Sequence, residues 1–567
     1  MKTMGIGEVA KLLGVKPYII RYWESELPLL APRKSPSGRR QYTPHDVELL
    51  MRFKNLLYGR KFTVEGAKKQ IWEELGGPVP DTRAKISEIR AEMIDLLVRL
   101  QGRKESEMTE RECIEKFTAL GHGRLFTHWE PRPPEMKRRL MEDLGALDTS
   151  ILESLHSRLE ETPQYPESVR PAPFASLYES RRDADAIRIG EELIRGGRTA
   201  FLTVAGGQGS RLGFDGPKGM FPISPIRRLT LFALFAEKLR AARVLYKAEI
   251  PWLIMASPQN EDSTREYFEK EGYFDLGRDS VRFFTQGTLP SLSAEGELLL
   301  DGEGGLFFNP NGHGGTLEAL RSSGLLEEME ERGVEELFYF QIDNPLVIVP
   351  DPIFLGFHRR AESQISTKVI RKAFPEDKLG TIATLPSGKP TVIEYSDLPQ
   401  ELMHEKTPDG DLKFSHGSIA IHLLNVDYVS SRPLALPFHT ARKKVRTLNP
   451  TPDGTEIVER EAVKFEMFIF DAIPQAERFL FFETDRAEEF SPVKNKEGVD
   501  SVETCIRGQT EKFAGWLSAC GLRMPRDDKG RPRYAVEISP LFAADRASLI
   551  KRRAELPQEI DHDILLT

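Results

Sequence analysis

The chain has 567 residues, of which 40% are hydrophobic and 29% charged, with a net charge of −8. This length allows three or four domains with sizeable cores, and the composition excludes a globally disordered chain. Three widely spaced cysteines, Cys113, Cys505 and Cys520, exclude a disulfide framework and a cysteine zinc site. Since no apolar run has the length of a signal peptide or a membrane span, we expect a cytoplasmic protein without membrane contact.

The first 75 residues are a basic segment of an acidic chain. They contain 14 Lys and Arg against 8 Asp and Glu, a net charge of +6, which leaves −14 for the remainder. Apolar residues at helical spacing, a turn at Gly14 and a second helix over 16–24 predict a helix-turn-helix. The loop PRKSPSGRRQY that follows has the cations and the central Ser-Gly of a wing. The charge therefore predicts a polyanionic partner for this segment alone.

The strings IGEVAKLLGV, IIRYWE, SGRRQYTPHDVELL and GRKFTVEGAKKQI occur in this order and resemble the winged helix-turn-helix DNA-binding domain of MerR-family regulators. The resemblance implies binding of double-stranded DNA by residues 1–75. A basic packing domain that no longer touches DNA is the alternative. The contacts that the resemblance implies come from Lys16, Tyr18, Arg21, Tyr22, Arg39, Arg40 and Tyr42.

Residues 76–106 read as a helical linker. Within 82–104, apolar residues recur in alternating steps of three and four, a heptad seam. This helix is either the contact of a homodimer, as in MerR-like proteins, or packs on its own chain. Residues 107–198 follow as further helices and a proline-rich run, and we interpret them as an adaptor to the next domain.

A glycine-rich loop begins where an apolar strand ends, at 201–204, and Arg211 and Lys218 follow it. Residues without Cβ let backbone N–H groups approach a phosphate, and two cations could balance a triphosphate. Leu212 stands where the dinucleotide fingerprint has its third glycine, and the Walker ending G-K-[ST] is missing. The loop therefore predicts a nucleotide phosphate site of another kind.

Strands at 252–257, 281–286 and 336–343 alternate with helices downstream of this loop. The alternation predicts a mainly parallel sheet with ligands at the carboxyl ends of its strands. Asp343 ends one strand, where a carboxylate suits a Mg²⁺ (or Mn²⁺) ion that bridges phosphates. A second backbone cradle, NPNGHGG over 309–315, precedes a helix.

These motifs resemble, in order, those of the sugar-nucleotide pyrophosphorylases, and within them the UDP-N-acetylhexosamine pyrophosphorylases and their UDP-glucose relatives. The strings that carry the resemblance are AGGQGSRLG, PKGMF, QG, NPNGHGG, IDN, EYSD, FSHGSIAIH, VKFEMFIFD and FSPVKN. It implies an α/β fold: a Rossmann-like, GT-A-like nucleotidyltransferase body with a mixed sheet over 199–500, and a small C-terminal lobe over 501–567. It also implies that UTP and a hexose or N-acetylhexosamine 1-phosphate give a UDP-sugar and pyrophosphate.

The resemblance assigns roles to individual residues. It makes Arg211, Lys218 and Lys494 the catalytic cations and Asp343 the metal ligand. His313 and Ser418 depart from the asparagines of the acetylhexosamine branch, whereas Gly315 matches that branch, so the sugar stays open. The nucleotide- and substrate-binding residues would be Ala205, Gly206, Gly207, Gln208, Gln286, Gly312, His313, Gly314, Glu394, Ser418 and Lys464.

Three functional hypotheses follow. The first is a working uridylyltransferase fused to a DNA-binding domain. The second is a transcription regulator that uses a weakly catalytic, enzyme-like body as a sugar-nucleotide sensor, and the third is an enzyme whose basic head serves assembly only. The retained charges at Arg211, Lys218, Asp343 and Lys494 favour the first, because a sensor has little need of attacking geometry.

Overall fold

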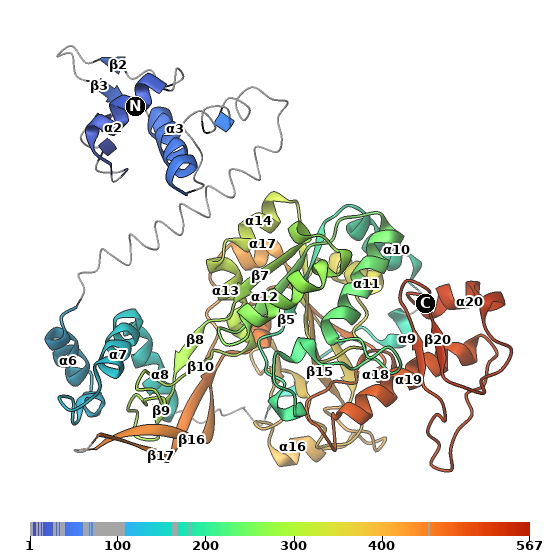
Figure 1. Ribbon diagram of the computed structural model, residues 1–567. Helices are drawn as coiled ribbons and strands as arrows, with labels where there is room; N and C mark the ends of the chain where they lie inside the picture. The colour runs from blue at the N-terminus through green and yellow to red at the C-terminus, as the bar shows by residue number, and fades with distance from the viewer. Residues whose placement is uncertain are drawn as a thin grey trace. The chain divides into compact units, whose positions relative to one another are not determined.

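The computed structural model (Figure 1) falls into two compact units, residues 1–107 and 108–567. The predicted boundary at 75 lies inside the first unit, and those at 198 and 500 lie inside the second. The predicted dimer helix, 82–104, lies outside the described residues. The structure describes residues 4–6, 9–10, 13, 15–26, 30, 33–34, 40–42, 44–59, 67, 70–71, 108–160, 168–180, 183–451 and 454–567.

The described residues of the first unit include a small three-stranded antiparallel sheet and the helices α2 and α3. The sheet has the order β1-β3-β2. The predicted helix over 16–24 is α2, and it packs against α3 through Trp23 and Phe53, whose rings meet edge to face at 5.8 Å. The elements are β1 (Met4–Gly5), α2 (Pro17–Glu26), β2 (Arg33–Lys34), β3 (Arg40–Tyr42), α3 (Pro44–Lys54) and a π-helical turn, η1 (Asn55–Gly59).

The prediction that Tyr42 contacts DNA is wrong. Its side chain is 0% exposed, and its hydroxyl donates a hydrogen bond to Glu24. Tyr42 therefore belongs to the core of this unit, where it packs with Trp23 and Phe53 in the same apolar cluster. Lys16 and Arg21 are exposed, and their contact with DNA stays a prediction. Arg39 and the side chains of Tyr18, Tyr22 and Arg40 lie outside the part that the structure describes.

The second unit is built on a ten-stranded mixed sheet. Its central path is β14-β13-β15-β11-β5-β6-β7, in which β11, β5, β6 and β7 are parallel and β15 runs antiparallel to β11. β12 and β18 are also parallel, and the other pairings of the sheet are antiparallel. The mixed sheet that the resemblance implied is therefore confirmed, whereas the alternation of strands and helices predicted too parallel a sheet. The strands are β4 (Arg170–Pro171), β5 (Thr199–Val204), β6 (Trp252–Ala256), β7 (Val281–Thr285), β11 (Glu336–Gln341), β12 (Ile365–Arg371), β13 (Gly380–Thr384), β14 (Pro390–Ile393), β15 (His416–Asn425) and β18 (Phe479–Glu483).

Helices cover both faces of this sheet (Figure 1). Alternate residues of β5 enter different cores, Phe201 one and Leu202 the other. This period of two is the pattern of a strand that is buried on both faces. The first core is closed by α10 (Ala184–Arg195), α11 (Leu231–Tyr246), α12 (Glu261–Lys270) and α15 (Pro352–Arg360), and the second by α13 (Thr316–Ser322), α14 (Leu325–Glu331) and α17 (Val426–Ser430).

The single helix expected after the second glycine loop is in fact two, α13 and α14. Gly324 separates them with φ of +74°, a left-handed conformation that glycine adopts without strain and that ends a helix.

A third core joins the N-terminal helices of this unit to a long hairpin (Figure 1). The hairpin pairs β16 with β17 over 13 residues each, and β9 pairs with the other edge of β17. The elements are α6 (Glu110–Ala119), α7 (Pro134–Ala146), α8 (Ser150–Glu160), β8 (Thr288–Pro290), β9 (Leu292–Ser293), β10 (Phe308–Pro310), β16 (His439–Thr451) and β17 (Gly454–Glu466).

The C-terminal lobe has its own small core. The lobe begins with a helix, α19, and a parallel pair of short strands follows it. Glu537 ties the lobe to the main body, because its carboxylate accepts hydrogen bonds from the side chain and backbone of Arg227. The remaining elements are α9 (Leu177–Ser180), α16 (Gln400–His404), α18 (Arg486–Glu489), α19 (Val502–Ala519), β19 (Val536–Ile538), α20 (Arg546–Lys551) and β20 (Ile564–Leu566).

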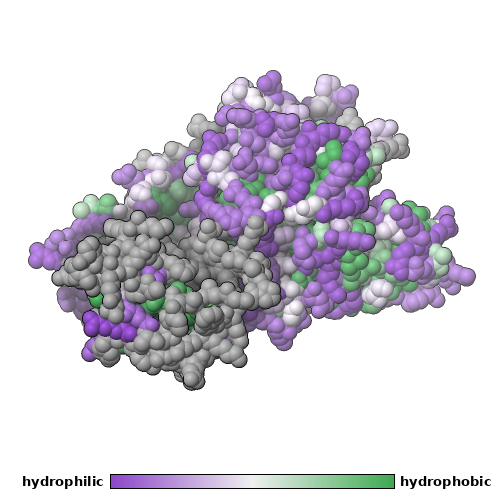
Figure 2. All heavy atoms as spheres, turned by 90° about the horizontal axis from the view of Figure 1, so that it is seen from above, coloured by the Kyte–Doolittle hydropathy of each residue, from purple (hydrophilic) through white to green (hydrophobic). Residues whose placement is uncertain are grey.

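On the face seen in Figure 2, hydrophilic residues cover most of the described surface and apolar residues form scattered patches. Within the described ranges, no helix combines the length and the apolar character needed to cross a bilayer.

Helices α10 and α15 pack through glycines that leave no room for a methyl group. A Cβ on Gly190 would lie 1.8 Å from the carbonyl oxygen of Pro352. We expect Gly190→Ala to lower the free energy of unfolding by about 3 kcal/mol, because backbone must move to admit the methyl group. Gly145→Ala in α7 is the control, since nothing lies within 4 Å of the added Cβ, and it should instead stabilise by about 0.5 to 1 kcal/mol. Thermal or denaturant unfolding of both variants measures the difference.

Candidate active site

A cavity of about 210 Å³ lies beyond the carboxyl end of β11, whose last residue is Gln341. Five of the predicted site residues line it, although they come from five separate segments of the chain. A cavity at this edge of a sheet is where α/β folds bind their ligands. These five residues are His313, Asp343, Glu394, Ser418 and Lys494.

The first glycine loop is held by backbone hydrogen bonds at the end of β5. The Ala205 N–H donates to the carbonyl of Met255 (2.8 Å), and the Lys218 N–H donates to the carbonyl of Gly207 (2.9 Å). A Cβ on Gly206 would lie 2.9 Å from the side chain of Gln286, so this position has little room for a larger residue. The hydrogen bond between Lys218 and Gly207 holds the backbone of Lys218 against the glycine loop, and so fixes the position of its Cα.

Charged groups of this loop meet the end of β11. The Lys218 ammonium lies 3.6 Å from Asp343 Oδ2, and the two side chains are 18% and 13% exposed. The Val493 N–H donates to the Asp343 carbonyl (2.8 Å), which brings the segment that carries Lys494 against the same strand end. Lys494 itself lies 4.0 Å from Asp500. Predicted positive and negative groups therefore meet at one edge of the sheet.

Arg211 lies in the turn beyond the glycine loop, where its carbonyl accepts a hydrogen bond from the Lys496 N–H (3.0 Å). Its side chain is exposed, and its guanidinium forms no hydrogen bond or ion pair with any residue that the structure describes. An unpaired guanidinium next to the Lys494 segment is available to a phosphate.

The donor groups around Asp343 fit a metal ion carried by phosphates. No group of three histidine, cysteine or acidic residues among the described residues could hold an ion on its own. Mg²⁺ in nucleotide sites is commonly bound by one or two carboxylates, with phosphates and water completing its shell. Asp343, which lines the cavity beside Lys218, offers one such carboxylate.

The second glycine loop lies against the strand end of β17. Gly312 has φ of +83°, and a Cβ on it would lie 2.4 Å from the Met467 carbonyl oxygen, so only glycine fits. The Gly314 N–H donates to that carbonyl (2.7 Å). Gln286 joins the two glycine loops, because its side-chain amide donates to the Gly312 carbonyl (2.7 Å).

His313 presents a hydrogen-bond donor to the cavity. Its Nδ1 accepts from the Ile469 N–H at 3.3 Å, which leaves the proton on Nε2. Burial lowers the pKa of His313 to about 4, so the ring is neutral near pH 7. The ring stacks on Phe468 at 5.2 Å between centroids. His313 can therefore donate to a ligand without adding charge.

Glu394 and Ser418 also line the cavity. Burial raises the pKa of Glu394, and nearby Asp397 raises it further, which extends the pH range in which the carboxyl can donate as well as accept. The Ser418 hydroxyl accepts from the Ala420 N–H (3.2 Å), so its own proton is free for a ligand. Polar groups of this kind suit sugar hydroxyls.

Lys464 is not among the cavity residues. It lies on β17 and forms an ion pair with Glu466, at 2.5 Å from Nζ to Oε1. A Cβ on Gly312 would touch Glu466, so Lys464 belongs to the support of the second glycine loop. Further predicted residues lie outside the lining of the cavity. Lys218 adjoins it through Asp343, and Gln286 through Gly312, next to His313. The residues outside the lining are Ala205, Gly206, Gly207, Gln208, Arg211, Lys218, Gln286, Gly312 and Gly314.

Several residues of the site were missed in the sequence. Asn260 donates its amide to the carbonyl of Ala205 (3.0 Å) and so holds the first glycine loop. Asn344, Lys378 and Tyr395 line the cavity. Asn344 and Tyr395 adjoin predicted residues, and that adjacency was a usable signal. Nothing local marks Asn260 or Lys378.

Comparison with known proteins adds to this geometry. The family model described as UTP–glucose-1-phosphate uridylyltransferase matches residues 165–504, and the one described as MerR HTH family regulatory protein matches residues 4–73. The chain is 33% identical over 433 residues to the UDP-N-acetylglucosamine pyrophosphorylase of Saccharomyces cerevisiae, covering 71% of this chain and 90% of the relative. It is 32% identical over 473 residues to UDP-N-acetylglucosamine diphosphorylase 1 of Arabidopsis thaliana, covering 77% and 90%.

Solved structures of pyrophosphorylases are also similar to this chain. The putative UDP-N-acetylglucosamine pyrophosphorylase of Entamoeba histolytica superposes with a TM-score of 0.62 at 29% identity, covering 70% of this chain and all of that one. The uridine diphosphate N-acetylglucosamine pyrophosphorylase of Trypanosoma brucei, solved with an inhibitor, superposes with a TM-score of 0.64 at 25% identity, covering 81% and 99%.

Proposed function

Because the chain belongs to the UTP–glucose-1-phosphate uridylyltransferase family and carries a MerR-type domain at its start, we propose that it makes a UDP-sugar and pyrophosphate. The substrates are UTP and a hexose or N-acetylhexosamine 1-phosphate. One observation carries this proposal: a single cavity is lined both by charged groups that suit phosphates, Lys494 and Asp343 with Lys218 beside it, and by polar groups that suit sugar hydroxyls, Glu394 and Ser418.

The reaction needs charge neutralisation and alignment more than it needs a protein base. An oxygen of the sugar phosphate is already anionic, so it attacks the α-phosphorus of UTP directly. A new P–O bond forms, and the bond from the α-phosphorus to the bridging oxygen breaks and releases pyrophosphate. Lys218 and Lys494 stabilise the charge at the transferred phosphate, and Arg211 holds the leaving pyrophosphate. When bound on Asp343, Mg²⁺ would neutralise phosphate oxygens.

The test is pyrophosphate release from UTP with a panel of glucose, galactose, N-acetylglucosamine and N-acetylgalactosamine 1-phosphates. The named relatives make N-acetylglucosamine 1-phosphate the first substrate to try. We expect release with at least one of the four sugars and dependence on Mg²⁺ or Mn²⁺. If the protein releases no pyrophosphate with any of the four sugars but still binds a UDP-sugar, it would instead be a transcription regulator that senses sugar nucleotides.

We further propose that the first unit binds double-stranded DNA. The match over 4–73, the net charge of +6 over residues 1–75 and the exposed Lys16 and Arg21 support this. We expect Arg21→Ala to weaken binding to the region upstream of the chain's own gene and to reduce the slope of log affinity against log salt by about one.

A gel-shift titration at several salt concentrations measures both quantities. Lys270→Ala is the matched control, since it removes one exposed cation from the second unit. If Arg21→Ala binds like Lys270→Ala at every salt concentration, Arg21 does not contact DNA; if the unaltered protein shifts no DNA, the first unit serves assembly.

A further inference from the structure

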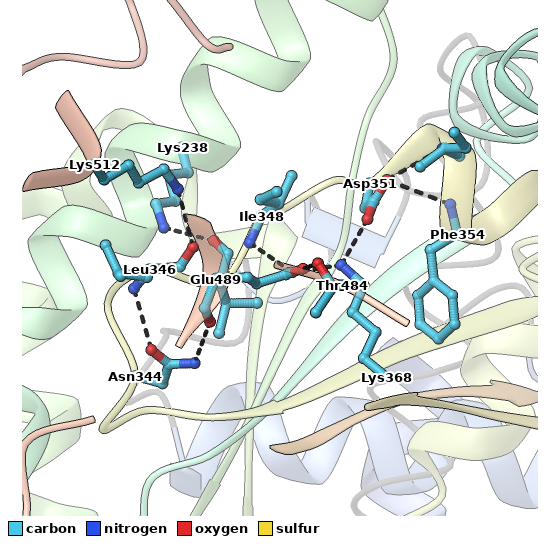
Figure 3. A network of polar contacts seen from close by, with 12 residues as sticks. Lys238, Asn344, Leu346, Ile348, Asp351, Phe354, Lys368, Thr484, Glu489 and Lys512 are labelled. Atoms are coloured by element: carbon cyan, nitrogen blue, oxygen red, sulfur yellow. Dashed lines mark hydrogen bonds and ion pairs between the residues drawn. The ribbon is translucent and has the colours of Figure 1, made fainter. Parts of the chain in front are cut away.

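A buried polar network joins β12 to the segments 343–348 and 489–494 (Figure 3). At its centre Lys368, from β12, is 0% exposed and lies between two carboxylates, those of Asp351 (2.6 Å) and Glu489. Burial opposes the charge on Lys368, but the two carboxylates prevail and raise its pKa. The network therefore holds a charged lysine between two acids inside the protein.

Glu489 connects this centre to both segments that carry phosphate-facing groups. Its Oε1 accepts from the Ile348 N–H (3.1 Å), and its backbone carbonyl accepts from the Asn344 amide (2.8 Å). The oxygen of the same Asn344 amide, Oδ1, accepts from the Ser491 N–H (3.1 Å). Segment 343–348, which begins with Asp343, is thereby fastened to segment 489–494, which ends with Lys494 (Figure 3).

Two more lysines hold segment 343–348 from its other side. Lys238, from α11, donates to the carbonyls of Pro345 and Val347, both at 2.6 Å. Lys512, from α19, donates to the carbonyl of Leu346 (3.2 Å). Burial lowers the pKa of both lysines. Three successive carbonyls are thus bound by lysine side chains, which fixes the path of this segment.

We propose that Glu489 is a positioning residue for uridylyl transfer: it sets the separation between Asp343 and Lys494 by holding segment 343–348 against segment 489–494. This inference rests on the proposed function. Stability alone does not account for the network, because well-packed apolar residues often stabilise a core at least as well as a buried ion pair. Positioning does account for it, since a displacement of about 1 Å at the reacting groups can cost about 10²-fold in rate.

Asp351 provides a matched control. Glu489→Gln and Asp351→Asn each remove one of the two carboxylate charges on Lys368. The other contacts of Asp351 are to the Ile353 and Phe354 N–H groups at the start of α15, not to segment 489–494. The two variants should lower the unfolding temperature by similar amounts. They should differ in how firmly segments 343–348 and 489–494 are held together, and so in turnover.

Hydrogen exchange and kinetics test the inference together. In Glu489→Gln, we expect about tenfold faster exchange of the Ile348, Ser491 and Val493 amides. The turnover number should fall about 10- to 100-fold with little change in either KM. In Asp351→Asn, faster exchange should be confined to Ile353 and Phe354, with near-normal turnover. Thr484→Val replaces Glu489→Gln if the latter folds poorly. It removes only the hydroxyl that donates to Glu489 Oε2 (2.8 Å), so we expect the same changes in exchange and turnover, but smaller ones.

The inference is overturned if Glu489→Gln and Asp351→Asn show equal exchange rates at segments 343–348 and 489–494 and lose turnover equally. The network would then only stabilise the fold. The exchange measurement does not need turnover. If the unaltered protein transfers no uridylyl group with any sugar, the proposed function fails, while the exchange pattern still decides whether Glu489 holds the two segments together.

Discussion

Replacing Lys218 by alanine should lower the turnover number for pyrophosphate release by about 10²- to 10³-fold at saturating UTP and sugar 1-phosphate. The ammonium is fixed 3.6 Å from Asp343, and the backbone hydrogen bond to Gly207 fixes where its side chain begins. A cation that is held in place before the reaction stabilises the transition state without reorganisation. KM should change less than turnover, because the charge matters most while the phosphate bonds are changing.

Two variants frame this result. Lys218→Arg keeps the charge but spreads it over a planar fork, so we expect partial activity between the wild type and Lys218→Ala. Lys270→Ala removes an exposed cation of the same unit and should leave turnover unchanged. Near-normal pyrophosphate release by Lys218→Ala would mean that the transferred phosphate is bound elsewhere than beside Asp343.

Local sequence signals predicted the strand ends of this site well. β5, β6, β7 and β11 begin and end within a few residues of their predicted positions, because each is an apolar run that ends at glycine or polar residues. Ligands of a parallel sheet gather at the carboxyl ends of its strands, so Asp343 could be predicted to meet the glycine loop. The 3.6 Å contact between Lys218 and Asp343 agrees with that reasoning.

Residues whose role depends on distant partners were not predictable in this way. Tyr42 follows a basic wing, but its orientation depends on the strand pairing of β3, which turns it into the core. Lys238 and Lys512 lie on helices, where lysine usually faces water, and only the folded loop at 345–347 explains their burial. Tertiary contacts decide each of these cases.

Replacing Asp343 by asparagine should reduce turnover by about 10³-fold, since a metal ion contributes several kcal/mol to charge stabilisation at a phosphoryl centre. Asparagine keeps the shape of the side chain but removes the charge that would bind Mg²⁺ and that faces Lys218. The unfolding temperature should change little, because Asp343 lines a cavity rather than a core. Asp528→Asn, an exposed carboxylate in the C-terminal lobe, is the matched control.

The metal dependence distinguishes loss of a ligand from loss of a charge. If Asp343 binds the ion, Asp343→Asn should need a higher Mg²⁺ concentration for half-maximal activity, and it should bind Mn²⁺ more weakly in the presence of UTP, measured by electron paramagnetic resonance. If the Mn²⁺ affinity is normal and only turnover is lost, the carboxylate instead acts by orienting Lys218. The ion would then be held by the nucleotide phosphates without this residue, and Lys218→Ala combined with Asp343→Asn should be no slower than Lys218→Ala alone, since both changes would remove the same interaction.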